Sequence, residues 1–257
     1  MSYDRTRVMG ILNLTPDSFF DGGRYHGRGA EARAFEMVDA GADIIDIGGE
    51  STRPGFMPVP ESEEIARIIP FIRDVAPSLS VPLSVDTMKP AVAAEALAAG
   101  AAVINDVGGL RDEGMIKTIV ENGAAVIIMH APSDIVTVHD AEMSGDPMSE
   151  IRSFLHKAAG NAVSNGIKKN HIIIDPGIGF GKTAEQNWAI IRNVRRLCGE
   201  YPVMIGASRK RFLAHAYPSL SSDDASIEAA VSAAGNGVSM VRVHDVAGTV
   251  RRLQDRK

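Results

Sequence analysis

The 257-residue sequence has little of what disulfide-stabilised, membrane-spanning or nucleic-acid-binding proteins require. Cys198 is the only cysteine, which excludes an internal disulfide and gives no sign of an oxidising compartment. No apolar run approaches the ~20 residues of a membrane span. Lys and Arg total 27 against 32 Asp and Glu, with no basic block, so we expect no nucleic-acid partner. Residues 1–7 are polar and charged, unlike a secretory signal, and we expect a cytoplasmic protein.

What the chain does contain is one repeated pattern: a short β-rich apolar run, a polar turn and a longer helical stretch. Eight such runs begin at Val8, Ala42, Val81, Ala102, Ala125, His171, Val203 and Met240. Short runs separated by helices predict parallel strands with crossover connections. Eight βα units need roughly 250 residues. The sequence therefore predicts an α/β protein, a (β/α)8 TIM barrel that forms a single domain over residues 1–257.

Proline and glycine mark the ends of the predicted helices. Pro90 opens a helix over 91–99 and Gly100 ends it, as expected for Pro in the first turn and Gly after the last. Gly41, Gly123 and Gly166 each stand just before a strand and predict further helix ends. The longest irregular segments, 14–29, 48–60 and 130–147, all follow strands. They are expected to lie on one face of the barrel, as binding loops or lids.

Polar or ionisable residues stand at the end of every predicted strand. In barrel enzymes this is where the chemistry occurs. Taken in order, these residues are Asn13, Asp46 with Glu50, Asp86, Asn105 with Asp106, His130 after Met129, Asp175, Ser208 with Arg209 and Lys210, and Arg242 with His244. Any one of the residues Asp86, Asn105 and Asp175 has a purely structural alternative, because Asp and Asn favour turns and helix caps. All eight strand ends being polar favours a binding site.

The strand-end residues divide by chemistry. Asp86, Asn105 and Asp175 offer acceptors and an amide that suit a heterocycle with several N–H donors, since a carboxylate can accept two parallel N–H bonds. Ser208, Arg209, Lys210, Arg242 and His244 form a donor-rich, cationic group at the seventh and eighth strands, the frequent phosphate site of barrels. A binding site for a heterocycle beside a binding site for phosphate predicts a substrate that carries both groups.

Other motifs carry less weight. The segment 176–183 ends like a P-loop but begins with Pro176, and the segment 206–210 resembles a nucleophile elbow but ends in Lys210. The run Arg209–Arg211 has a solvated basic turn as its alternative. Of the seven histidines, only His244 is assigned to the site; His130 is either packed or a supporting group. None forms a zinc-binding pattern.

Taken together, several segments resemble the dihydropteroate synthase family of pterin-binding enzymes. The matching stretches are 9–24 (MGILNLTPDSFFDGGR), 46–55 (DIGGESTRPG), 84–87 (SVDT), 105–109 (NDVGG), 129–130 (MH), 175–182 (DPGIGFGK), 206–212 (GASRKRF) and 242–246 (RVHDV). They run almost from one end of the chain to the other, in the family order. The resemblance implies a transferase that joins 6-hydroxymethyl-7,8-dihydropterin pyrophosphate to p-aminobenzoate, giving 7,8-dihydropteroate and pyrophosphate in folate biosynthesis.

The resemblance also implies a role for each matching residue. The pterin would be held by Asp86, Asn105, Met129, Asp175, Phe180, Gly206 and Lys210. The p-aminobenzoate would be held by Phe19, Thr52, Arg53, Pro54 and Ser208. The diphosphate would contact Asn13, Thr52, Arg242 and His244, with Asn13 also near Mg²⁺ as cofactor. Asp86, Lys210, Arg242 and His244 are the implied catalytic residues, and the family implies a homodimer and sensitivity to sulfonamides.

Four positions depart from the family pattern, and two other functions compete. The residues Ala131, Pro132, Gln186 and Ala214 replace residues that are common in the family, which affects the contacts expected of the fifth loop. One rival is a barrel that transfers a methyl group from methyltetrahydrofolate to a corrinoid, which would share the Asp-Asn-Asp grip but not the STRPG loop, SRK or RVHD. The other is an inactive pterin-binding homologue, which would be expected to have lost diphosphate or loop residues. Arg53, whose alternative is a surface ion pair, is present, as are Asn13, Lys210 and Arg242.

Overall fold

The computed structural model describes residues 5–15, 28–50, 58–132, 143 and 146–255. Within these residues, eight strands form one parallel sheet. They are β1 Arg7–Asn13, β2 Ile44–Gly48, β3 Leu83–Asp86, β4 Val103–Asp106, β5 Ala125–Met129, β6 Ile172–Asp175, β7 Met204–Ile205 and β8 Met240–Val243.

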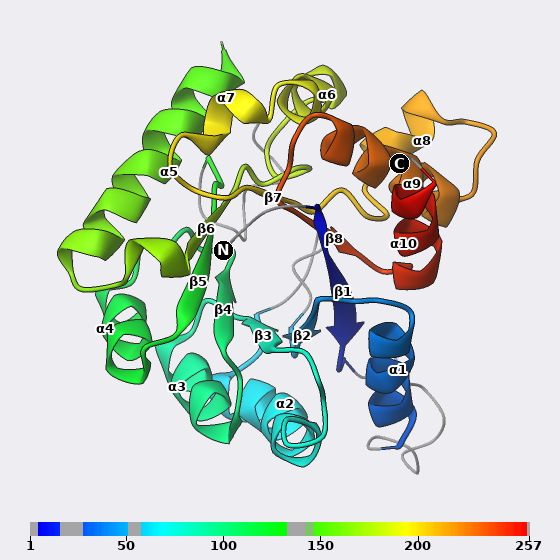
Figure 1. The fold of residues 1–257 in the computed structure, drawn as a ribbon. Helices are drawn as coiled ribbons and strands as arrows, with labels where there is room; N and C mark the ends of the chain where they lie inside the picture. Colours follow the sequence, from blue (N-terminus) through cyan, green and yellow to red (C-terminus); the bar gives the residue numbers. More distant parts are fainter. Residues whose placement is uncertain (1–4, 16–27, 51–57, 133–142, 144–145, 256–257) are drawn as a thin grey trace.

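The sheet curls into a barrel that is almost fully closed. Its strand order is β6-β5-β4-β3-β2-β1-β8-β7, with each neighbouring pair parallel. Between β6 and β7 the closure consists of a single bridge, Ile174 with Val203, in which the Ile174 N–H donates to the Pro202 carbonyl at 2.9 Å. Figure 1 shows the strands at the centre with the helices around them. The predicted (β/α)8 barrel is confirmed.

The described helices alternate with the strands around the outside of the barrel. They are α1 Arg28–Asp39, α2 Glu61–Val75, α3 Pro90–Ala99, α4 Glu113–Asn122, α5 Pro147–Ser164, α6 Ala184–Arg192, α7 Arg195–Cys198, α8 Phe212–Ala216, α9 Ser222–Gly235 and α10 Val246–Gln254, with a 3-10 turn, η2, at Lys169–His171. None of these helices combines the length and the apolar composition needed to cross a membrane.

The proline and glycine signals mark helix ends where the sequence predicted them. Pro90 is in the first turn of α3, and Gly100 follows its last turn with a φ of 120°. Gly41, Gly123 and Gly166 also have positive φ values, of 97°, 62° and 107°. Side chains with a Cβ rarely adopt this backbone conformation, so each glycine lets the chain leave a helix and enter the next strand.

Five strands begin one or two residues after the start of their apolar runs, and at two of them proline is the physical reason. The run from Val81 becomes strand only at Leu83, and the run from Val203 only at Met204. Pro82 and Pro202 lack an N–H and contribute only carbonyls, which accept from Ile45 at 3.3 Å and from Ile174 at 2.9 Å. At the start of both segments the chain therefore accepts hydrogen bonds from the neighbouring strand but donates none through the proline.

Inside the barrel, an apolar floor lies beneath a polar layer. Met9, Val103, Ile127, Met204 and Met240 form a buried cluster of their own, separate from the larger core between the strands and the helices. Because side chains alternate along a strand, the residues two positions further on also point inward. On β2, β4, β6 and β8 those residues are Asp46, Asn105, Asp175 and Arg242. The barrel therefore changes from apolar to charged towards the carboxyl ends of its strands.

Candidate active site

The inward positions at the strand ends include most of the side chains singled out from the sequence. Counting in steps of two from the apolar floor gives Asn13, Asp86, Asn105, Met129, Asp175, Gly206, Arg242 and His244. The register places neighbours side by side: Asp86 pairs with Asn105 across β3 and β4, and Met129 pairs with Asp175 across β5 and β6. These eight residues, which come from strands or strand ends around the barrel, converge at one rim.

A guanidinium between two carboxylates forms the centre of this rim. Arg242 Nε donates to Asp46 Oδ2 at 2.6 Å, and Arg242 Nη2 donates to Asp86 Oδ2 at 2.7 Å. Asp46 is fully buried, while the side chains of Asp86 and Arg242 are 13% and 19% exposed. Arg242 thus joins β8 to β2 and β3. In this form of the protein its charge is directed at carboxylates.

Asp46 also fixes the orientation of Asn105. Asn105 Nδ2 donates to Asp46 Oδ2 at 3.1 Å, so its carbonyl oxygen points the other way. Among the described residues, buried Asn105 Oδ1 and Asp46 Oδ1 have no hydrogen-bond partner. Buried acceptors are normally paired, so these oxygens suit donors supplied by a ligand or by water. Asp46 was noted only as a strand end in the sequence. Its place at the end of a predicted strand was the signal present in the sequence, while its bond to Asn105 follows from the strand register.

The other two carboxyl groups of the rim, Asp86 and Asp175, have raised pKa values. Burial raises the pKa of Asp86 to about 7, against the opposing effect of Arg242, and the nearby charge of Asp46 adds to the rise. Burial likewise raises the pKa of Asp175 to about 6, although the Gly177 N–H donates to its Oδ1 at 2.7 Å and Arg242, Lys182 and Lys210 attract its charge. Desolvated carboxylates of this kind are typical of binding and catalytic sites.

Lys210 and Phe180 face each other beside Asp175. The Lys210 Nζ lies 4.0 Å from the centre of the Phe180 ring, within the range of a cation–π contact. The Lys210 side chain crosses Gly179, where an added Cβ would be 2.9 Å from Lys210 Cδ. Glycine is therefore needed at position 179 for the lysine to reach the rim.

One wall of the rim is apolar. Met129 and Phe180 pack with Val107 and Ala131 in a small buried cluster, and Met88 packs against its edge. This cluster lies next to Asp175, the neighbour of Met129 across β5 and β6. A flat ring could therefore meet apolar surface on its face and acceptors at its edge. On the other side, Gly206 leaves room beside Arg242, whose Cβ would be 3.9 Å from a Cβ at that position.

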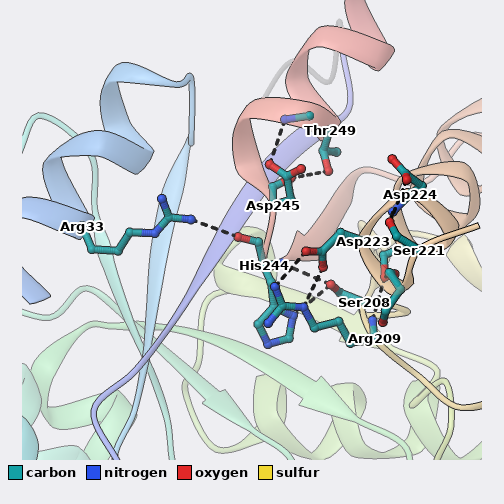
Figure 2. Close-up of polar contacts among 12 residues, drawn as sticks. Arg33, Ser208, Arg209, Ser221, Asp223, Asp224, His244, Asp245 and Thr249 are labelled. Atoms are coloured by element: carbon teal, nitrogen blue, oxygen red, sulfur yellow. Dashed lines mark hydrogen bonds and ion pairs between the residues drawn. The ribbon is translucent and has the colours of Figure 1, made fainter. Parts of the chain in front are cut away.

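Ser208 and His244 join the ends of β7 and β8. Ser208 Oγ lies 2.9 Å from His244 Nδ1 and accepts from the His244 backbone N–H at 3.2 Å (Figure 2). Arg209 points elsewhere, because its guanidinium binds exposed Asp223 at 2.7 and 3.0 Å and its φ is 57°. Arg211 is exposed. The basic turn therefore contributes Lys210 to the rim, while Arg209 and Arg211 remain at the surface.

Asn13 lies at the end of β1, the strand next to β8. An added Cβ on Gly48 would be 3.1 Å from Asn13 Oδ1 and 4.0 Å from the Asp86 Cβ, so Gly48 leaves space between the two side chains. Among the described residues, no group of three or more His, Cys, Asp or Glu side chains could hold a metal ion. A metal here would take few protein ligands, of which the Asn13 amide oxygen is the candidate.

Four residues assigned to p-aminobenzoate, Phe19, Thr52, Arg53 and Pro54, lie outside the described residues. The described residues on either side of 51–57 are fastened by one lysine that the sequence did not single out. Lys89 Nζ donates to Glu50 Oε2 at 2.6 Å, to Glu64 Oε2 at 2.6 Å and to the Val59 carbonyl at 2.8 Å. Residues 50 and 59 are thereby held to the start of α3.

The departures from the family pattern stay clear of the rim carboxylates. The Ala131 side chain is buried in the apolar wall, and its carbonyl accepts from Arg111 at 2.7 Å. Gln186 forms a capping box with Thr183 at the start of α6 and donates to the Met143 carbonyl. Ala214 is exposed on α8. Of these three residues, Ala131 comes nearest to the predicted site.

A cavity of about 460 Å³ lies away from the strand ends, between α5 and α7. Arg152, His156 and Arg196 are among its lining residues, and the two arginines are exposed at the surface. It includes none of the rim residues. The concentration of buried ionisable groups is at the rim, and we place the chemistry there.

Comparison with known proteins gives one consistent result. A family model described as "Pterin binding enzyme" matches residues 9–244. The dihydropteroate synthase of Bacillus subtilis (strain 168) is 42% identical over 252 residues, which covers 96% of this chain and 86% of that protein.

Solved structures agree with the sequence relatives. The dihydropteroate synthase of Xanthomonas albilineans with 4-aminobenzoic acid is 41% identical, with a TM-score of 0.92 and coverage of 100% of this chain and 93% of that one. The same enzyme in complex with 7,8-dihydropteroate is 38% identical, with a TM-score of 0.89 and coverage of 100% of this chain and 94% of that one. A Yersinia pestis dihydropteroate synthase in a sulfonamide complex is 38% identical, with a TM-score of 0.91 and coverage of 99% of this chain and 94% of that one.

Proposed function

The chain belongs to the pterin-binding enzyme family, and from this premise we propose that it is a dihydropteroate synthase. Its reaction joins 6-hydroxymethyl-7,8-dihydropterin pyrophosphate to p-aminobenzoate, giving 7,8-dihydropteroate and pyrophosphate. The observation that carries this proposal is the convergence of Asp86, Asn105 and Asp175 with Lys210 and Arg242 at one rim. The relatives support dihydropteroate synthase over the methyltetrahydrofolate–corrinoid alternative.

The acceptors of the rim suit the pterin. Its amino-pyrimidinone edge presents N–H donors, and Asp175 and Asn105 Oδ1 are acceptors in a dry environment where such bonds are strong. Lys210 supplies the donor for the ring carbonyl and nitrogen atoms. Met129 and Phe180 cover the ring face, which excludes water from the bound heterocycle.

The residues at the other side of the rim suit a diphosphate. Arg242, His244 and Asn13 come from adjacent strands β8 and β1. Mg²⁺ bound to a diphosphate keeps several waters and needs few protein ligands, so the single Asn13 amide oxygen fits such an ion. When bound, Mg²⁺ would neutralise charge on the departing diphosphate.

The reaction requires one bond to break and one to form. The methylene C–O bond breaks with its electron pair leaving on the diphosphate, where Arg242 and His244 stabilise the negative charge. The amine lone pair of p-aminobenzoate forms the new C–N bond, and the nitrogen then loses a proton. An aryl amine is unprotonated at neutral pH, so no base is needed before the attack. The charge of Asp86 would favour positive charge developing at the methylene carbon.

The remaining assignments are proposals of the same kind. Phe19, Thr52, Arg53 and Pro54, together with Ser208, hold p-aminobenzoate, and Thr52 also contacts the diphosphate. Residues 1–257 act as one domain, two copies form a homodimer, and the protein works in the cytoplasm without nucleic-acid or membrane partners. The size of the shared family match, 9–244, supports the single unit.

Pyrophosphate release tests the function directly. Mixing the protein with the pterin pyrophosphate, p-aminobenzoate and Mg²⁺ should release pyrophosphate and form dihydropteroate in equal amounts. Omitting p-aminobenzoate should abolish product formation. Folded protein that releases no pyrophosphate would support the inactive-homologue alternative and end the assignment.

Sulfonamides are expected to inhibit this reaction in competition with p-aminobenzoate. They carry the same aryl amine, and a relative has been solved in complex with one. Raising p-aminobenzoate should therefore restore full velocity at fixed sulfonamide, which initial-rate measurements will detect. Inhibition that persists at saturating p-aminobenzoate would show that the aryl site is misplaced.

A further inference from the structure

Lys182 is a buried lysine that the reaction scheme above does not use, and burial lowers the pKa of its amine to about 7, against the attraction of the Asp175 charge. Only 9% of its surface is exposed. Its Nζ donates to the carbonyls of Gly177 and Phe180, both at 2.9 Å, and lies 3.3 Å from His130 Nδ1. Two of these acceptors belong to the loop between β6 and α6, and the third follows β5. One amino group therefore ties this loop into a ring and fastens it to the neighbouring strand.

The His130 ring faces this amino group. It is 1% exposed and packs edge-on against Phe154, with ring centres 5.1 Å apart. Burial, with the charges of Lys182 and Arg111, lowers the pKa of His130 to about 3, so its ring is neutral at physiological pH. A neutral ring can accept at Nδ1 from the protonated form of Lys182. This contact answers whether His130 is packed or supporting: it is both.

The loop held by Lys182 contributes several parts of the pterin site. The Gly177 N–H donates to Asp175 Oδ1 at 2.7 Å, and Gly179 provides the space that Lys210 crosses. Phe180, whose carbonyl Lys182 binds, places its ring 4.0 Å from Lys210 Nζ. At Gly177 the backbone approaches the His130 carbonyl so closely that a Cβ would collide with it. The loop is pressed against β5 with no room to shift inward.

We propose that Lys182 is a positioning residue for pterin binding, which sets the place of Phe180 and of the Asp175 carboxylate by holding residues 177–180 against His130. This inference rests on the proposed function. Lys182 acts through the backbone of the loop, and its charge also attracts that of Asp175. Its removal is expected to weaken the pterin site while leaving the p-aminobenzoate site intact, because none of its contacts reaches Ser208.

Lys182→Met tests this, since it keeps the apolar stem and removes the amino group. We expect the KM for the pterin pyrophosphate to rise about tenfold, the scale of one lost charge-assisted contact, while the KM for p-aminobenzoate changes less than about twofold. Calorimetric titration with 6-hydroxymethyl-7,8-dihydropterin, which lacks the leaving group, should show the same loss of affinity without any turnover.

Thr183→Ala is the matched control. Thr183 caps α6 by accepting from Gln186 N, so its removal destabilises the adjacent helix without touching the ring of contacts around Lys182. Equal increases in the pterin KM for both variants would reduce Lys182 to a structural role and overturn the inference. So would an unchanged pterin KM in Lys182→Met.

Misfolding of Lys182→Met and failure of the proposed function would give different results. If Lys182→Met does not fold, Lys182→Gln, which retains donors for the loop carbonyls, decides: its pterin affinity should fall by a smaller factor, and wild-type affinity would overturn the inference. If the wild-type protein itself releases no pyrophosphate, the proposed function fails. The titration with 6-hydroxymethyl-7,8-dihydropterin then still decides the role of Lys182 in binding.

Discussion

Replacing Asp175 with Asn is expected to lower kcat/KM for the pterin pyrophosphate about a thousandfold, with little change in the KM for p-aminobenzoate. The reason is geometric. Oδ1 of residue 175 accepts from the Gly177 N–H at 2.7 Å, so an asparagine would keep its oxygen there and turn its NH2 towards the ligand. A donor would then face the N–H donors of the pterin. Sites that present the wrong hydrogen-bonding group reject a ligand by factors of ~10⁴, and the carboxylate charge is lost as well.

The same variant should not be less stable at neutral pH, which separates binding from folding. Burial raises the pKa of Asp175 to about 6, above its ordinary value of 3.8. A carboxyl with a raised folded pKa binds its proton more tightly in the native state, so ionisation costs stability as the pH rises from about 4 to 6. A neutral asparagine side chain at this position has no such cost. Thermal unfolding should therefore show that the melting temperature of the variant rises relative to that of the wild type between pH 4 and pH 7.

Initial rates and calorimetric pterin binding check the first expectation, and melting temperatures at several pH values check the second. Asp223→Asn is a suitable control, because Asp223 is an exposed carboxylate paired with Arg209 away from the rim. It should leave both measurements near wild type. A pterin KM within about threefold of wild type in Asp175→Asn would remove Asp175 from the pterin site.

The barrel and the place of its site were accessible from the sequence because both depend on short-range periodicity. Alternation with a period of two puts residues such as Asn105 and Arg242 inward, whatever lies around them. Helix ends at Gly41 and Gly100 follow from backbone conformations that only glycine adopts easily. Even β7, which is reduced to Met204–Ile205, was found from its apolar run. The sequence did not show that Pro202 would leave its pairing with β6 to a single bridge.

Partnerships between strands were not accessible in the same way. Lys182 and His130 are 52 positions apart, and neither has a motif that indicates the other. Asp46 was visible as a strand end, but its grip on Asn105 depends on the register of β2, β3 and β4 together. Arg209 and Lys210 are consecutive and chemically similar, yet they diverge because Arg209 adopts a positive φ and pairs with Asp223.

Arg242 shows why a residue's role cannot be taken from its type alone. Its position near the end of β8 predicted contacts with a diphosphate, and it is inward as expected. In this structure, however, its guanidinium neutralises Asp46 and Asp86. A diphosphate bound at the rim would compete with these carboxylates for the same N–H groups. Substrate binding and the stability of the rim are therefore coupled through one side chain.

Replacing Arg242 with Met is accordingly expected to destroy activity and to destabilise the fold by about 3 kcal/mol, the scale for removing one partner of a largely buried ion pair. The fully buried Asp46 and the 13% exposed Asp86 would be left without their counter-ion. Burial and Asp46 already raise the pKa of Asp86 to about 7, and loss of Arg242 removes the main opposing effect. Because the native state then holds that proton to a higher pH, the stability deficit should grow as the pH rises above 7.

A second substitution separates the two consequences. Adding Asp46→Asn to Arg242→Met removes one of the two stranded charges, so urea denaturation should show most of the lost stability restored. Pyrophosphate release should stay at least about a thousandfold below wild type, because nothing replaces the guanidinium at the diphosphate. If the double variant recovered activity along with stability, the effect of Arg242 on the reaction would be only that of a counter-ion, and its place on the diphosphate would be wrong. If Arg242→Met were as stable as wild type at pH 8, the carboxylates of the rim would have to be neutralised by some other group.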